Sequence, residues 1–216
     1  MWIKNNLFSI PVYKTNISSD SFDKEIIVKT IENNYLKASL RNNFDSNSDI
    51  HLQYEDENNK IFDKINYKKI NTQYEKIFNN FFSTQFHYKK TFKYEFFNCN
   101  YTAGKKNQFM SPHNHLPNSD FSCIHYLKLS KKNENYTTFI NSNDFSDYFR
   151  YLKPDLNKIS DLNNIENSYM SYKFSLKVEE NDFIIFPSIL KHMIEKINSD
   201  DLRITIVTDV TLKENN

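Results

Sequence analysis

Four residues of this sequence have the types and spacing of a metal site with an anion-binding group beside it. His113 and His115 form a His-x-His pair, a third histidine lies far downstream at His192, and Arg203 follows after a polar turn. Residues two apart on a strand point to the same face, so both rings of the pair would enter one space. Neutral imidazole is a common ligand of iron, zinc and other first-row metals. We therefore predict a metal site formed by His113, His115 and His192.

Arg203 stands between Leu202 and Ile204 on a predicted strand and shares its face with Thr205. An inward guanidinium needs an anionic partner, because burying an unpaired charge is very costly. The guanidinium group matches a carboxylate through two parallel hydrogen bonds, and the hydroxyl of Thr205 can add another. The structural alternatives are an internal ion pair with Asp or Glu, or an arginine that faces outward. With a metal site nearby, the pattern favours a carboxylate that belongs to a ligand.

Composition excludes several classes of function. Only 38% of the residues are hydrophobic but 16% are aromatic, so large rings must build the core. The net charge is +1 without a long block of one sign, which does not indicate a surface for duplex nucleic acid. Gly104 is the only glycine. A phosphate-binding loop, a dinucleotide fingerprint and a Gly-x-Ser-x-Gly nucleophile elbow all need more glycines, so none of them is present.

The two cysteines and the first residues point to a soluble intracellular protein. Cys99 and Cys123 lie in strand-like apolar runs and form no metal-binding or disulfide pattern, which is typical of reduced core cysteines. The start of the chain lacks the apolar segment of a signal peptide, and no apolar run reaches membrane-spanning length. Richness in Asn, Lys and Ile is typical of an AT-rich genome. We expect the cytoplasm of a bacterium or of a phage-infected cell.

The elements that must position these residues follow a simple order along the chain. Apolar residues at helical spacing predict helices over about residues 21–36 and 61–82, with a long polar loop over residues 41–59 between them. From about residue 91 the period becomes strand-like and stays so to residue 213. Helices followed by a run of strands predict an α+β, mainly β protein with a sandwich or barrel core and helices outside. We expect one domain over residues 1–216, with helical support at about 20–83, a core at about 91–213, and a polar insertion or lid at about 142–168.

Several segments of the chain carry a resemblance to a known family. They are the opening run Leu7-Phe8-Ser9-Ile10-Pro11-Val12-Tyr13, then Pro112-His113-Asn114-His115, Ser122-Cys123-Ile124-His125-Tyr126-Leu127, Phe186-Pro187-Ser188-Ile189-Leu190-Lys191-His192 and Arg203-Ile204-Thr205-Ile206. Together they resemble the iron(II)/2-oxoglutarate-dependent oxygenase superfamily, and within it a group of oxygenases found in phages and bacteria. The resemblance covers nearly the whole length apart from residues 142–168.

The resemblance implies a double-stranded β-helix core, also called a jelly roll or cupin-like core, with the metal at its open end. The protein would bind Fe(II), and 2-oxoglutarate would chelate the metal while Arg203 and Thr205 hold its distal carboxylate. Tyr126 and His125 are further cosubstrate-binding candidates. The implied reaction uses dioxygen, releases succinate and CO2 from 2-oxoglutarate, and hydroxylates a C–H bond of a second substrate. The near-zero net charge favours a peptide or a small molecule over nucleic acid as that substrate.

Two departures from the family pattern leave alternatives open. Most of the superfamily uses His-x-Asp/Glu with a distal histidine, whereas this chain has His115 at the carboxylate position. Either His115 replaces the carboxylate, or only one of His113 and His115 binds and water completes the site. His125 stands where tyrosine is usual, and either contacts the cosubstrate or fills the barrel wall. Asp120 falls in a turn and is not counted as a ligand.

Two other classes of function remain as alternatives. Three histidines and water also describe a cupin-like zinc or manganese hydrolase or lyase. That interpretation gives Arg203 no task, which argues against it. The second alternative is a non-catalytic jelly-roll binding protein that retains the histidines.

Overall fold

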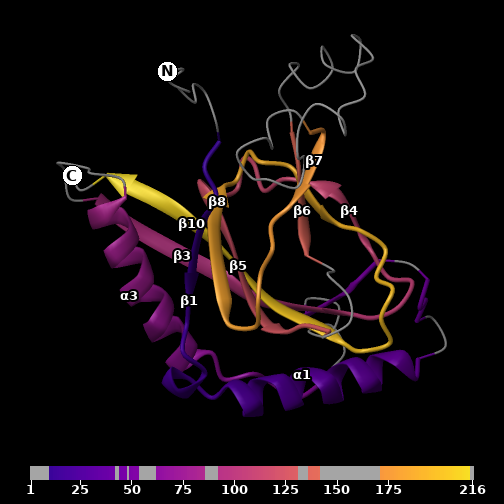
Figure 1. Cartoon of the computed structure of the whole chain (residues 1–216). Helices are drawn as coiled ribbons and strands as arrows, with labels where there is room; N and C mark the ends of the chain where they lie inside the picture. Colours follow the sequence, from indigo (N-terminus) through magenta and orange to yellow (C-terminus); the bar gives the residue numbers. More distant parts are fainter. Residues whose placement is uncertain are drawn as a thin grey trace, which may run out of the picture.

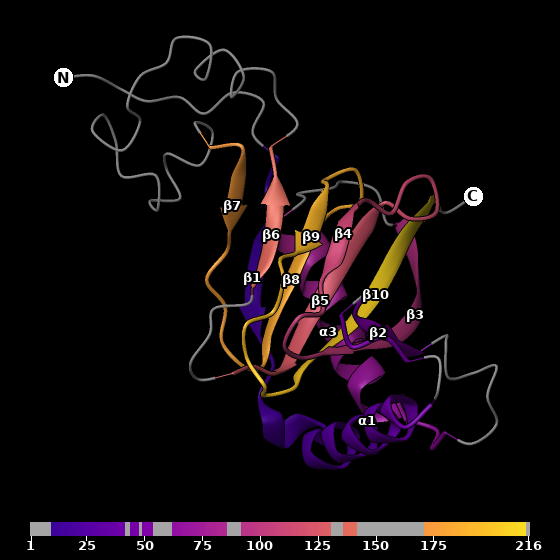
Figure 2. The same cartoon turned by 90° about the vertical axis from the view of Figure 1, so that its right-hand side faces the viewer.

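The computed structural model describes residues 10–41, 44–47, 49–53, 62–85, 92–130, 136–141 and 171–214, and it has two antiparallel sheets that face each other (Figures 1 and 2). The larger sheet has the strand order β1-β8-β5-β10-β3-β2 and the smaller has the order β4-β9-β6-β7. The strands of the larger sheet are β1 (Tyr13–Asn16), β8 (Asp182–Pro187), β5 (Phe121–Lys128), β10 (Arg203–Glu214), β3 (Phe92–Gly104) and β2 (His51–Leu52). Those of the smaller sheet are β4 (Met110–His113), β9 (His192–Ile194), β6 (Thr137–Ile140) and β7 (Lys173–Ser175).

Two helices pack against the larger sheet: α3 (Lys68–Thr84) lies along the side that faces away from the smaller sheet, and α1 (Lys24–Ser39) runs across one end of the strands (Figures 1 and 2). A short 3-10 helix, η1 (Ser19–Ser21), precedes α1. Each helix buries one stripe at helical spacing, which on α3 consists of Ile70, Tyr74, Phe78, Phe81 and Phe82. These rings and the apolar residues of the sheet form the main core. Large aromatic residues therefore build this layer, as the composition predicts.

The strands of the larger sheet send alternate residues to two different cores. On β5, Cys123 and Leu127 join the core under the helices, whereas Ile124 and Tyr126 join a second core between the two sheets. On β10, Ile204 and Ile206 likewise face the helices. The period of two along a strand means that the intervening residues of β10 face the smaller sheet. The space between the sheets is where polar side chains from both sheets meet.

Gly104 ends β3 and pairs with Arg203 at the start of β10. A Cβ atom at this position would lie 2.5 Å from the Cγ1 atom of Ile50. The only glycine of the sequence therefore allows the segment before β2 to pack closely over the end of β3. This close approach holds the neighbourhood of Arg203 together.

The structure changes several predicted boundaries. The first helix begins at Lys24 instead of residue 21, because η1 occupies residues 19–21. The second helix begins at Lys68 instead of residue 61. Just before this start, the side chain of Asn66 accepts a hydrogen bond from the backbone N–H of Lys68 (3.0 Å), which makes a turn. The predicted loop over residues 41–59 contains the two-residue strand β2.

Some predictions concern residues outside the described ranges. The proposed insertion or lid at residues 142–168 lies wholly outside them, as does the start of the predicted opening strand at residues 7–9. Residues 10–12 of that prediction are not in a strand, and β1 begins at Tyr13 and runs to Asn16, at the edge of the larger sheet. No helix in the described ranges is long and apolar enough to span a membrane.

Candidate metal centre and anion site

Three histidines converge at one end of the space between the sheets. His113 ends β4 and His192 begins β9, and the two residues are direct partners in the antiparallel pair of strands. His115 follows β4, where its backbone N–H donates to the carbonyl of Ser188 (3.1 Å). One nitrogen from each ring lies within 4.8 Å of the others. The sequence predicts this convergence from a strand spacing of two, but His115 reaches the site from the loop after the strand.

The hydrogen bonds of the three rings leave the same nitrogen available on each. The Nδ1 atom of His113 bonds the carbonyl of Ser111 (2.8 Å), that of His192 bonds the carbonyl of Leu190 (3.1 Å), and that of His115 bonds a carboxylate oxygen of Asp209 (2.9 Å). Carbonyls and carboxylates only accept, so Nδ1 carries the proton in each ring and Nε2 keeps its lone pair.

A divalent metal fits this donor set. Among the described residues, the Nε2 atom of His115 is buried without a hydrogen-bond partner, and an unsatisfied buried nitrogen with a lone pair suits a metal ligand. Close ring contacts support the same geometry: the tilted rings of His113 and His192 have centroids 4.3 Å apart, and the stacked rings of His115 and His192 have centroids 5.2 Å apart. The residues present can therefore hold a metal ion through three imidazole nitrogens.

Burial keeps these rings in the form that binds metals. It lowers the pKa of His192 to about 3, an effect to which the neighbouring His113 adds. Burial lowers the pKa of His113 as well, with a smaller contribution in the same direction from His115. At neutral pH both rings are uncharged, and no proton has to leave before a metal binds.

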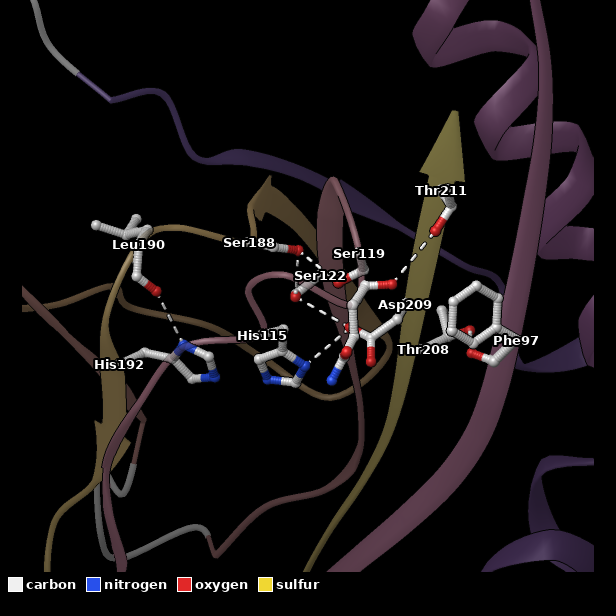
Figure 3. A network of polar contacts seen from close by, with 11 residues as sticks. Phe97, His115, Ser119, Ser122, Ser188, Leu190, His192, Thr208, Asp209 and Thr211 are labelled. Atoms are coloured by element: carbon white, nitrogen blue, oxygen red, sulfur yellow. Dashed lines mark hydrogen bonds and ion pairs between the residues drawn. The ribbon is translucent and has the colours of Figure 1, made fainter. Parts of the chain in front are cut away.

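Asp209 is a residue of this site that the sequence interpretation missed. Figure 3 shows it on β10, directed toward the ring of His115, with its Oδ1 atom also accepting a hydrogen bond from Ser122 (3.0 Å). A signal was available, because Asp209 lies on the same face of β10 as Arg203 and Thr205. Counting along the strand by twos from Arg203 reaches a carboxylate that the histidines would meet.

The predicted anion-binding residues also lie between the sheets. Arg203 is buried, with only 2% of its surface exposed, and its Nη1 atom donates to the hydroxyl of Thr205 (3.5 Å). The ring of Tyr126 lies 5.5 Å from the Cζ atom of Arg203, and its hydroxyl donates to that of Thr137 (2.8 Å). The hydroxyl of Thr205 shares a hydrogen bond with that of Thr102 (2.7 Å). Arg203, Thr205 and Tyr126 thus form one cluster.

Burial disfavours the charged form of Arg203. Burial lowers the pKa of the Arg203 guanidinium, while Tyr126 acts in the opposite direction. Burial also raises the pKa of the Tyr126 hydroxyl, so tyrosine is neutral at physiological pH. A buried cation among hydroxyl groups and an aromatic ring is suited to receive an anion.

His125 lies on the other face of β5, in the core under the helices, and the structure does not bring it together with the other predicted site residues. Its ring contacts those of Phe22, Tyr74 and Phe183, and its Nδ1 atom bonds the hydroxyl of Tyr74 (3.0 Å). Burial lowers its pKa to about 3. Of the two expectations for His125, the position on the barrel wall fits, and we do not retain it among the cosubstrate-binding candidates.

A pocket of about 550 Å³ lies between β1 and α3, lined by residues that include Tyr13, Phe81 and Phe183. None of the three converging histidines lines it. We therefore choose the candidate site from the chemistry of its donor set and not from the size of this pocket.

Comparisons with known proteins agree with this geometry. Residues 99–209 match the model of the family described as "Putative 2OG-Fe(II) oxygenase", which includes the segments that bear the three histidines and Arg203. No curated protein matches the sequence.

Three solved structures share the fold. A viral collagen prolyl hydroxylase from Paramecium Bursaria Chlorella virus-1 has a TM-score of 0.53 at 11% identity, over 100% of this chain and 98% of that chain. A prolyl-4-hydroxylase from Pseudomonas putida has a TM-score of 0.51 at 8% identity, over 96% and 95%. HygX from Streptomyces hygroscopicus, with nickel and 2-oxoglutarate bound, has a TM-score of 0.51 at 9% identity, over 94% and 82%.

These neighbours confirm the expected double-stranded β-helix, in which two antiparallel sheets face each other. The family match spans half of the chain and includes the proposed centre. The chain belongs to the 2OG-Fe(II) oxygenase family, whose members use Fe(II) and 2-oxoglutarate.

Proposed function

We propose that the protein is a 2-oxoglutarate-dependent dioxygenase that hydroxylates a C–H bond of a second substrate. In this proposal His113, His115 and His192 hold Fe(II) through their Nε2 atoms. The observation that carries the proposal is the shared pattern of the three rings, in which each Nδ1 is bonded to an acceptor. The bound metal would supply the activation of dioxygen and the oxidation, with succinate and CO2 as the products of 2-oxoglutarate.

The protein's own contribution is to bind and orient the cosubstrate. Arg203 would receive the distal carboxylate of 2-oxoglutarate through two parallel hydrogen bonds, and the hydroxyl of Thr205 would add a third. Tyr126 lies against the guanidinium and is tied to Thr137, so it limits where Arg203 can move. Since these residues lie between the two sheets, water is displaced from around the charges and each hydrogen bond is strengthened.

The zinc or manganese hydrolase or lyase is supported less well. Three imidazoles are common to both interpretations, but only an oxygenase that uses a dicarboxylate gives the buried Arg203 a role in binding a ligand. The binding-protein alternative does not account for three rings that share one protonation pattern around a common point.

For the second substrate we propose a peptide or a small molecule. The net charge of +1 provides no broad basic surface of the kind that binds nucleic acid. Two of the structural neighbours are named as prolyl hydroxylases, which makes proline-containing peptides the first class to assay.

The experiment is to measure succinate formed from 2-oxoglutarate with and without added Fe(II). The second substrate is not identified, so succinate is measured without it and the expected rate is slow. The variant His192→Ala therefore serves as the background. We expect Fe(II)-dependent succinate in the natural protein and none above background in His192→Ala. Equal succinate in both proteins would refute the proposal.

A further inference from the structure

We propose that Asp209, hydrogen-bonded to His115, supplies a negative charge next to the metal centre and holds His115 in its metal-binding tautomer. Asp209 is a positioning residue in this proposal, since it acts on the metal through His115. The proposal rests on the proposed function, because His115 must be a metal ligand for Asp209 to affect the metal.

The contact between the two residues is direct and shielded from water. The Nδ1–H group of His115 donates to the Oδ1 atom of Asp209 (2.9 Å), and their side chains are only 17% and 13% exposed. The opposite nitrogen, Nε2, is buried and has no hydrogen-bond partner in the part of the chain that the structure describes. Asp209 therefore presents the free lone pair of His115 to the point where the other two rings converge.

The regular alternation of β10 brings Asp209 to this position, because β10 keeps one register with β5 from Thr205 to Val210. The pairing of β10 with β3 shifts register between Val207 and Asp209, and the extra residue is on β3, where residues 98 and 99 lie opposite Thr208. The hydroxyl of Thr208 donates to the carbonyl of Phe97 (3.1 Å), which closes the irregular part of the ladder. Bulges are common next to active sites, and this one on β3 leaves the alternation of β10 intact. On the other edge of β10, Asp209 still pairs with Ser122.

A row of serines holds the carboxylate in place. The hydroxyl of Ser122 donates to Asp209 (3.0 Å) and shares a hydrogen bond with Ser188 (2.9 Å), which shares another with Ser119 (2.7 Å) (Figure 3). All three hydroxyl-bearing residues are buried. The row uses one oxygen of the carboxylate, and that oxygen also receives the bond from His115. Because Ser122 and His115 both donate to this oxygen, the carboxylate of Asp209 has little freedom to rotate away from His115.

Ser188 links both segments that carry ligands. Its carbonyl accepts from the backbone of His115 (3.1 Å), so the serine row fixes the main chain as well as the side chain of that residue. Two residues later, the carbonyl of Leu190 accepts from the Nδ1 atom of His192. The hydrogen bonds that orient His115 and His192 therefore both involve the segment from Ser188 to Leu190.

The charge of the centre explains why a carboxylate is useful here. Three neutral imidazoles leave the full charge of a divalent cation uncompensated, whereas a site with two histidines and one carboxylate compensates part of it. In this chain the position of the carboxylate is taken by His115, and the carboxylate bonded to its ring is Asp209. A hydrogen bond from an imidazole to a carboxylate makes the ring a more basic ligand.

The test measures the binding of Co²⁺ to purified, metal-free protein by competition with a coloured chelator. Asp209→Leu removes both the charge and the acceptor, and we expect it to weaken Co²⁺ binding by roughly 10- to 100-fold. Asp209→Asn keeps an oxygen acceptor but not the charge, and should lose less. Asp120→Asn is the matched control, because it removes the same charge from a carboxylate that accepts the backbone N–H of Leu212 (2.8 Å) and contacts none of the three histidines within the described ranges.

A second readout does not depend on the metal. Long-range nitrogen–proton NMR of the metal-free protein reports which nitrogen of His115 carries the proton. We expect the Nδ1–H form in the natural protein and in Asp120→Asn, and a mixture of tautomers in Asp209→Leu. If Asp209→Leu does not fold, Asp209→Asn still tests the charge through Co²⁺ affinity.

The outcomes separate this inference from the proposed function. If the natural protein binds Co²⁺ and both Asp209 variants bind it equally well, the inference is wrong and the metal centre stands. If His115→Ala binds Co²⁺ as the natural protein does, His115 is not a ligand and the inference is also wrong. If the natural protein binds no Co²⁺, the proposed function fails together with the inference.

Discussion

Replacing Arg203 with alanine should weaken the binding of 2-oxoglutarate far more than the binding of the metal. The guanidinium is only 2% exposed and lies in the same cluster as Thr205 and Tyr126. Removing it would leave the distal carboxylate of 2-oxoglutarate desolvated and without its cationic partner. Loss of one member of such a buried pair costs about 2–5 kcal/mol, which corresponds to roughly 30-fold to several thousand-fold in Kd.

The assay is calorimetric titration of 2-oxoglutarate into Mn²⁺-loaded protein under conditions where the metal stays bound. Arg203→Lys should recover only part of the loss, because an ammonium group cannot make the planar two-point contact. Lys128→Ala is the control, since Lys128 lies on the neighbouring strand and pairs with Glu32. It should bind 2-oxoglutarate as the natural protein does. Unchanged affinity in Arg203→Ala would refute the assignment of the cosubstrate site.

Three further predictions concern the histidines. His192→Ala should abolish binding of Fe(II) while the fold is retained, as measured by metal analysis and circular dichroism, and stoichiometric iron in this variant would contradict its role. If His113→Ala and His115→Ala each lose the metal, three histidines bind; if only one does, two histidines and water complete the site. The unfolded chain protonates His125 below about pH 6.5, whereas burial lowers its pKa to about 3 in the folded protein, so stability is fully present above pH 6.5 and falls as the pH drops toward 3. The loss is at most about 1.4 kcal/mol per pH unit for this residue, and His125→Phe should flatten the pH dependence of urea unfolding between pH 4 and 6; an unchanged slope would show that His125 does not contribute.

The residues that converge could be predicted because strand periodicity carries much of the information. His113 and Arg203 lie on strands, and alternation predicts which neighbours share their faces. The distal His192 follows the Phe-Pro-Ser segment that the resemblance picked out. The two helices could be predicted from their stripes, since the rings of α3 recur at helical spacing.

Other features depend on contacts that sequence periodicity does not contain. The side of β5 that His125 occupies follows from which face the helices cover, and a single strand pattern is the same for both faces. The strand β2 has only two residues, too few to show a period, and it forms because β3 offers a free edge. The later start of α3 follows from one side-chain hydrogen bond of Asn66.

Asp209 shows most clearly why the candidate site was incomplete. It lies nearly a hundred residues after His115 in the sequence, and strand periodicity does not show that its part of β10 lies beside the loop that carries His115. The resemblance directed attention to a carboxylate at the position of His115. In the structure, the carboxylate of Asp209 is instead hydrogen-bonded to the ring of His115, on the side away from the other two histidines.

The most direct test of the central claim is the visible spectrum of the Fe(II)-loaded protein as 2-oxoglutarate is added without oxygen. Chelation of the metal by 2-oxoglutarate predicts a weak charge-transfer band that grows with the cosubstrate and saturates at one equivalent per iron. The band should be absent in His192→Ala, which holds no iron, and should need far more 2-oxoglutarate in Arg203→Ala. Iron that stays bound without any band at saturating 2-oxoglutarate would contradict the account.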